Sequence, residues 1–185
     1  MTQGSGPRRT AEILDSTLRL LAEHGYERLT IEGVAERAGV NKTTIYRWWP
    51  SKAALLGAAL IDAPLLRFPV PDTGSFRGDL AALVRSLAGL LTDPRSAALA
   101  AAALGAAVQN AELAALVRSF FADRLAGELP LFARAVERGE LSAGADPMLL
   151  MDALAGAVWV RVLLRQLPVE EDFADKLASV LHNGG

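Results

Sequence analysis

Residues 30–52 read TIEGVAERAGVNKTTIYRWWPSK, and the residues that begin and end helices in this stretch decide the fold. Thr30 is placed to cap a helix, because a threonine hydroxyl accepts a hydrogen bond from an amide two or three residues ahead. Gly39 should end that helix, since glycine adopts positive φ at little cost. Asn41 can cap a second helix, which must be short because a proline follows nine residues later. Ser51 then caps a third helix, so the stretch predicts a helix-turn-helix.

The short second helix has two different faces. Ile45 and Trp49 lie four residues apart and can share a buried face. The side chains left outward are mostly hydrogen-bond donors: Lys42, Thr43, Tyr46 and Arg47. A slim helix with such a face can enter the major groove of DNA and reach the base edges. A solvated charged face, or a core role for Tyr46, is the alternative interpretation.

The rest of the chain predicts an all-α protein, because it is rich in alanine and leucine and shows no strand-like alternation. A helical apolar stripe precedes the motif, with Gly25 as its expected stop. A proline-rich stretch at 64–74 suggests a junction between a DNA-binding domain, residues 1–60, and a helical effector-binding and dimerisation domain, residues 61–185. Further helices are expected at about 75–91, 94–109, 111–138, 147–166 and 170–181, and Pro130 should kink or split the third of these.

Composition excludes several functions. The 185 residues contain no cysteine and two histidines, which rules out disulfides and thiolate metal sites and argues against an imidazole metal cluster. No phosphate-binding loop, metal-ligand spacing or nucleophile–histidine pattern is visible, so we expect no enzyme, no cofactor and no metal. Residues 1–52 carry eight Lys/Arg and six Asp/Glu, whereas the remainder carries eleven and fifteen. This polarity suits DNA binding at one end and argues against a general DNA-coating protein.

The most apolar long stretch, residues 148–164, is interrupted by Asp152 and Arg161. A membrane span needs about 20 mostly apolar residues, so we interpret this stretch as a buried helix of a soluble protein. The first ten residues are polar and glycine-rich, unlike an export signal. We therefore expect a cytoplasmic protein without membrane contact.

The N-terminal third resembles the helix-turn-helix of the TetR/AcrR family of regulators, over about residues 8–60. The matching residues are His24-Gly25-Tyr26, Leu29-Thr30, Val34-Ala35, Ala38-Gly39-Val40, Thr44-Ile45-Tyr46 and Trp49-Pro50-Ser51-Lys52-Ala53-Ala54-Leu55-Leu56. Trp48 departs from the pattern, since many members carry histidine there. Its indole N–H could donate to a phosphate, or the ring could only pack.

The resemblance implies a role for each matching position. Four residues would contact phosphates: Thr30, Thr44, Tyr46 and Lys52. Three would read base edges, with Arg47 or Lys42 best suited to guanine: Lys42, Thr43 and Arg47. In a dimer, the two recognition helices would lie about 34–36 Å apart over a palindromic operator in double-stranded DNA.

For the C-terminal region, the resemblance implies a small-molecule effector bound among the helices and a homodimer formed through the last two. The helix expected at 147–166 is apolar on broad faces, which favours a partner, with a purely intrachain core as the alternative. Aromatic or polar candidates for the effector site are Arg85, Gln109, Arg118, Phe121, Trp159 and Arg161. A repressor released by its effector is the leading hypothesis. An activator and an architectural DNA-binding protein remain alternatives.

Overall fold

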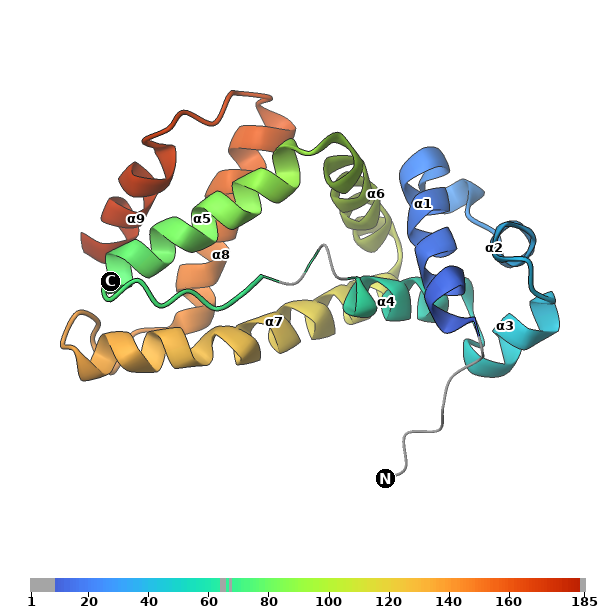
Figure 1. The fold of residues 1–185 in the computed structure, drawn as a ribbon, viewed down its shortest axis with the longest axis horizontal. Coiled ribbons are helices and arrows are strands. Elements are labelled where there is room, and N and C mark those ends of the chain that lie inside the picture. Colours follow the sequence, from blue (N-terminus) through green and yellow to red (C-terminus); the bar gives the residue numbers. More distant parts are fainter. Residues whose placement is uncertain (1–8, 64–65, 67, 184–185) are drawn as a thin grey trace. The chain divides into compact units, whose positions relative to one another are not determined.

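The computed structural model describes residues 9–63, 66 and 68–183, and within these ranges the regular structure is helical, without strands. Figure 1 shows the helices in chain order. They are α1 (Thr10–Arg28), α2 (Ile31–Ala38), α3 (Lys42–Trp48), α4 (Lys52–Asp62), α5 (Phe76–Thr92), α6 (Pro94–Gln109), α7 (Ala111–Glu137), α8 (Pro147–Trp159), the π-helical turn η2 (Val160–Leu164) and α9 (Phe173–Asn183). The all-α class is therefore confirmed.

The chain divides into two compact units. The first unit comprises Met1–Leu66 and Ala98–Phe120, and the second comprises Arg67–Ala97 and Phe121–Gly185. The division falls within α6 and α7, so each of these helices contributes residues to both units. The helix-turn-helix thus belongs to a unit that also contains residues from further along the chain.

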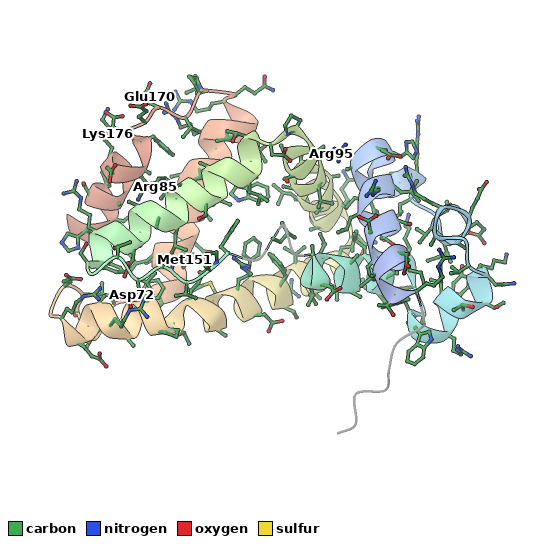
Figure 2. The ribbon with its side chains drawn as sticks, in the orientation of Figure 1. Asp72, Arg85, Arg95, Met151, Glu170 and Lys176 are labelled. Atoms are coloured by element: carbon green, nitrogen blue, oxygen red, sulfur yellow. The ribbon has the colours of Figure 1, made fainter. Side chains whose placement is uncertain are left out.

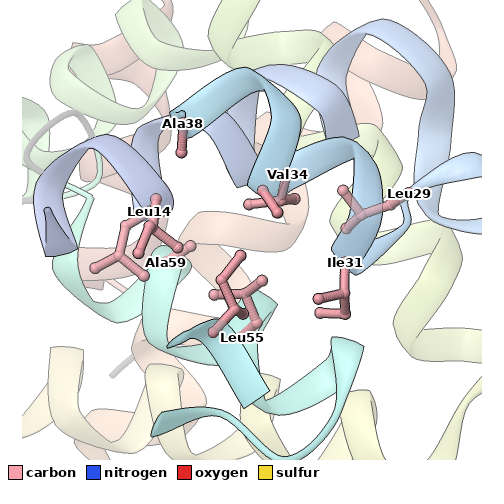
Figure 3. Packing of buried hydrophobic residues seen from close by; sticks show 10 residues of the cluster. Leu14, Leu29, Ile31, Val34, Ala38, Leu55 and Ala59 are labelled. Atoms are coloured by element: carbon pink, nitrogen blue, oxygen red, sulfur yellow. The ribbon is translucent and has the colours of Figure 1, made fainter. Parts of the chain in front are cut away.

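The core of the first unit is built from α1 to α4. Helix α1 packs against α2 and α4, and α2 packs against α3. Figure 3 shows the buried side chains that meet there, among them Leu14, Val34 and Leu55. Ile45 is fully buried in this cluster and Trp49 packs against it half-buried, as their four-residue spacing predicts. The apolar side of α3 is therefore fixed, and its other side is free to face a partner.

A second cluster joins α4 to the later part of the first unit. Leu56 is buried with Leu99 and Leu113, which come from α6 and α7. Gly57 allows a close approach between α4 and α7, because a Cβ at this position would lie 2.7 Å from Leu116 Cδ1. A larger residue at 57 would force Leu116 to move. Helix α4, which directly follows the recognition helix, is therefore packed tightly against the N-terminal part of α7.

The second unit is organised around α5, which packs along α9 and also contacts α8 and η2. Phe76, the first residue of α5, is completely buried, and its ring meets that of Phe132 edge-on at 5.9 Å. Arg85 on α5, labelled in Figure 2, forms an ion pair with Asp175 on α9 at 3.7 Å, and both side chains are exposed. Small residues, Ala174 and Ala178, form the buried side of α9 and permit this close packing.

Two helix ends differ from the sequence prediction. Gly25 has the expected positive φ of 74°, but helical structure resumes after it and α1 ends only at Arg28. The helix predicted at 147–166 ends as an α-helix at Trp159 and continues as the wider turn η2. Pro168 explains the end, since the residue before a proline avoids helical geometry, and Gln166 turns the chain with a φ of 51°.

The sequence predicts that Pro130 kinks or splits α7, and the structure shows no split. The helix runs through the proline as one element from Ala111 to Glu137. A proline within a helix removes one amide donor and crowds the carbonyl four residues earlier, and α7 continues on both sides of Pro130 despite this. A left-handed glycine, Gly139 with a φ of 71°, ends the helix instead.

The expectation that residues 148–164 form a buried helix also needs correction. Only Leu154 and Val158 of α8 are buried, and Leu149 remains 65% exposed. By length and composition alone, residues 147–164 form the one helical stretch in the described parts of the chain that could cross a membrane. In the single chain this apolar helix is therefore largely uncovered.

Candidate DNA-binding surface

Three side-chain caps define the helix-turn-helix, each at the residue that the sequence predicts. Thr30 Oγ1 accepts from the Gly33 amide at 3.1 Å, and Asn41 Oδ1 accepts from the Thr43 amide at 2.9 Å. Ser51 Oγ accepts from the Ala54 amide at 2.9 Å. Each cap satisfies an amide that has no partner within its own helix. The start of α2, α3 and α4 is thus fixed locally by the sequence.

The turn between α2 and α3 is held by Gly39, which has a φ of 63°. The Val40 amide donates back to Ala35 O at 2.9 Å, which closes the left-handed helix end. Arg9 Nη1 donates to Gly39 O at 3.1 Å and lies 3.0 Å from the position a Cβ would occupy. A side chain at 39 would therefore strain the backbone and displace Arg9.

A bidentate ion pair braces α2 against α1. Arg37 donates through Nη1 and Nη2 to the two carboxylate oxygens of Glu23, at 2.7 and 2.8 Å. The hydrogen bond from Arg37 holds the pKa of Glu23 below its usual range, so the pair is charged at neutral pH. This planar arrangement fixes orientation better than a single contact would.

The solvent side of α3 carries the predicted recognition residues. The exposed members are Lys42, Thr43, Tyr46, Arg47 and Trp48, and Thr44 is half-buried. Tyr46 is 46% exposed although it neighbours the fully buried Ile45, so it is not a core residue. The structure thus brings these six side chains together on one short helix.

Several of these side chains already have partners. Lys42 Nζ donates to Glu32 Oε1 at 3.2 Å, and the Thr43 hydroxyl donates to Asn41 Oδ1 at 2.9 Å. The pKa of Glu32 is lowered, first by a hydrogen bond from its own backbone amide and then by Lys42. The Arg47 guanidinium lies 5.8 Å from the centre of the Trp48 ring. A DNA phosphate or base would compete with an exposed carboxylate for Lys42.

Lys52 lies at the start of α4, and its ammonium points toward α1. Nζ donates to Tyr26 O at 2.9 Å and lies 4.0 Å from the centre of the Tyr26 ring. An ammonium has three donors, so this contact leaves donors for a phosphate. Lys52 thereby links the start of α4 to the end of α1.

The candidate effector residues are divided between the two units. Gln109 and Arg118 belong to the first unit and are exposed, and the other four belong to the second. Phe121 is exposed and Trp159 is half-buried. Arg161 holds the segment before α9, because it donates to Pro168 O at 2.9 Å, pairs with Glu170 at 3.6 Å and covers the Phe173 ring at 4.7 Å. This set of contacts gives Arg161 a structural role in the present conformation.

Sequence reasoning missed the residues that brace the motif from a distance. Arg9, Glu23 and Arg37 contact positions 14 to 30 residues away, and no local pattern identifies such partners. Glu32 is different, because the sequence alone could have indicated it: a carboxylate in the first turn of a helix is favoured by the helix dipole. Within the described residues, no group of three or more histidine, aspartate or glutamate side chains could hold a metal ion.

Two family profiles match the chain. Residues 13–59 match bacterial regulatory proteins of the tetR family, and residues 70–181 match the tetracyclin repressor-like C-terminal domain. A helix-turn-helix transcriptional regulator from Mycobacterium bovis is 36% identical over 172 residues, 92% of this chain and 84% of that protein. A DNA-binding transcriptional repressor from Mycobacteroides abscessus is 34% identical over 180 residues, 93% and 90% of the two chains.

Among solved structures, a TetR-family transcription regulator superimposes with a TM-score of 0.73 at 36% identity, over 97% of this chain and 99% of the other. The similarity therefore extends over both units and includes the helix-turn-helix. Membership of this family of regulators explains the capped helix-turn-helix and the exposed polar face of α3. It also explains why the sequence shows no catalytic pattern. The chain belongs to the TetR family of transcriptional regulators, which bind DNA through a helix-turn-helix and are not enzymes.

Proposed function

We propose that this protein is a homodimeric repressor that reads a palindromic operator and leaves it when a small molecule binds. The observation that carries the proposal is the two-faced α3 helix, with Ile45 buried and Tyr46 and Arg47 exposed beside it. In this proposal residues 1–60 bind DNA, and residues 61–185 bind the effector and dimerise. The family binds operator DNA and small molecules and is usually dimeric, which supports this assignment.

On the operator, Lys42, Thr43 and Arg47 would contact base edges. An arginine or lysine pairs well with the acceptors of guanine, and each good pair contributes about 1–3 kcal/mol of discrimination. The phosphate contacts would come from four hydroxyl or amino groups and the exposed indole: Thr30, Thr44, Tyr46, Lys52 and Trp48. The Thr30 hydroxyl accepts from Gly33 and so retains its own hydrogen for a phosphate.

Dimerisation through α8 and α9 is supported by their uncovered apolar side chains. Leu149 on α8 and Val180 on α9 are 65% and 68% exposed, and Leu164 at the end of η2 is more exposed still. Burying one such side chain stabilises an interface by about 1.5–3 kcal/mol. A two-fold interface made of two helices per chain would therefore gain stability by covering these side chains. A protein partner also explains why this apolar helix carries Asp152, which a membrane interior would disfavour.

Release requires that effector binding change the spacing or orientation of the two recognition helices. A coupling free energy of about 1–3 kcal/mol changes operator affinity about 5- to 150-fold, and the operator must weaken effector binding by the same factor. The effector candidates named from the sequence remain hypotheses, and Arg161 would have to give up its contacts with Pro168 and Glu170 to reach a ligand. We place the protein in the cytoplasm, where its operator lies.

Selection of DNA fragments with the purified full-length protein, at near-physiological salt, tests this proposal. The expected result is a palindromic motif with two half-sites about one helical turn apart. A single unpaired half-site would contradict the dimer, and enrichment without any motif would favour an architectural DNA-binding protein. An operator overlapping a promoter supports repression, whereas one upstream of it supports activation.

A further inference from the structure

Glu128 is a buried carboxylate without a full set of partners. It lies on α7 in the second unit, and the residue is 6% exposed. Its Oε2 atom is inaccessible to solvent and has no hydrogen-bond partner among the described residues. Buried polar groups in proteins are nearly always hydrogen-bonded, because leaving one unpaired in an apolar setting is costly. This oxygen therefore calls for a specific explanation.

The other oxygen has a partner of limited strength. Arg124 lies one turn earlier on α7, with Nη2 3.6 Å from Glu128 Oε1, and its guanidinium is stacked over the Phe68 ring at 4.9 Å. Burial raises the pKa of Glu128, and Arg124 opposes that rise only in part. Among the described residues, Arg124 thus compensates the negative charge of Glu128 only in part.

The surroundings of Glu128 on α7 are otherwise apolar. Its neighbours three and four residues away are Leu125, Leu131 and Phe132, besides Arg124. Leu131 and Phe132 are buried. A position that only filled the core would be served better by leucine or methionine, since replacing a buried charge by an apolar residue is often neutral or stabilising. The carboxylate is therefore better explained as an acceptor for something outside the chain.

We propose that Glu128 anchors the effector, and that the effector carries a protonated amine on an apolar body. This inference rests on the proposed effector-responsive function and specifies its chemistry. An ammonium supplies both the hydrogen that Oε2 lacks and the charge that Arg124 does not fully balance. The apolar neighbours on α7 favour a hydrophobic remainder of the molecule.

The test compares ligands that share a body and differ in the head group. Decylamine, decanol and decanoate form one set, and naphthylmethylamine and naphthylmethanol form another, each titrated calorimetrically into the full-length protein below any micelle-forming concentration. The wild type should bind at least one amine tenfold or more tighter than its alcohol, and tighter than decanoate. Glu128→Gln should lose at least tenfold for that amine and little for the alcohol. The control is Glu137→Gln, an exposed glutamate on the same helix, which should bind as the wild type does.

A second measurement separates a binding role from a structural one. If Glu128 serves a ligand, Glu128→Gln should be at least as thermally stable as the wild type, whereas a residue needed for folding would lower the melting temperature. Equal affinity for amine and alcohol, preference for decanoate, absence of amine binding, or an unchanged Glu128→Gln would overturn the inference. If another compound releases the operator and Glu128→Gln has no effect on it, the proposed repressor stands and only this inference fails. If no compound in a broad library changes operator affinity, the effector-responsive function itself fails.

Discussion

Ser51 Oγ donates a hydrogen bond to Glu112 Oε1 at 2.7 Å, across 61 residues of chain. The same hydroxyl oxygen accepts from the Ala54 amide and thereby caps α4. One serine therefore fixes the start of the helix that follows the recognition helix and ties it to the first turn of α7. Any movement of α7 at Glu112 acts directly on the end of the helix-turn-helix.

Substitutions of Ser51 and Glu112 should separate two contributions to stability: the cap of α4, and the Ser51–Glu112 hydrogen bond that tethers α4 to α7. Ser51→Ala removes both contacts and should lower the free energy of unfolding by about 1–2 kcal/mol. Glu112→Ala removes only the tether and should cost about 0.5–1.5 kcal/mol, whereas Glu112→Gln retains an acceptor and should cost less. Urea denaturation of the three variants provides the comparison. A loss in Glu112→Ala equal to that in Ser51→Ala would mean that the cap contributes little.

The recognition face is tested by Arg47→Ala and Tyr46→Phe. Arg47→Ala should weaken operator binding by about 1–3 kcal/mol and relax the preference at one base pair. Tyr46→Phe removes a phosphate donor and should weaken binding about equally for all sequences. Fluorescence anisotropy with the selected operator and single-base variants measures both, with the exposed Arg19→Ala on α1 as the control. Unchanged binding in both test variants would mean that α3 presents a different face.

The helix caps of the motif could be predicted from the sequence, whereas the contacts that hold the motif to distant parts of the chain could not. Thr30, Asn41 and Ser51 cap helices as their residue types and spacing predict. The Arg9–Gly39 and Ser51–Glu112 contacts depend on tertiary packing, which no local pattern encodes. The same limit applies to the dimerisation face, because an apolar helix looks alike in sequence whether its own chain or a partner covers it.

The ion pair between Lys42 and Glu32 should lower the affinity for operator DNA, because it engages the Lys42 ammonium. Glu32→Gln removes a carboxylate from the recognition surface and frees the Lys42 ammonium, now 3.2 Å away. We expect operator affinity to rise several-fold at low salt, with the gain shrinking as salt screens exposed charges. Anisotropy titrations at two salt concentrations measure this effect. Weaker binding by Glu32→Gln would show instead that Glu32 positions Lys42 for the operator.

In the second unit, two carboxylates share Arg134 but differ in burial. Asp79 is completely buried and accepts from the Thr73 amide and hydroxyl at 2.7 and 2.8 Å, with Arg138 at 3.5 Å. Asp72 is exposed and lies 3.5 Å from Arg134. Asp79→Ala should lower the free energy of unfolding by about 3–5 kcal/mol, because it removes the acceptor of the Thr73 amide and hydroxyl and a buried carboxylate from beside Arg134 and Arg138. Asp72→Ala should cost at most about 1 kcal/mol, and similar losses in denaturation would contradict this assignment.

The stability of the protein should also depend on pH through Glu128. Because burial raises the pKa of this carboxyl in the folded chain, the folded state holds its proton more tightly than the unfolded state does. The resulting contribution to stability is present below the pKa of the unfolded chain, about 4.3, and is lost as pH rises through the folded pKa. Glutamine mimics the neutral acid, so Glu128→Gln should melt at a higher temperature than the wild type at about pH 8, and the gap should narrow toward about pH 5. Arg124 beside Glu128 and every other ionisable group are common to both proteins, so the difference between their melting curves isolates this carboxyl. A gap that stays constant over this range would mean that Glu128 keeps its ordinary pKa and is compensated by a partner.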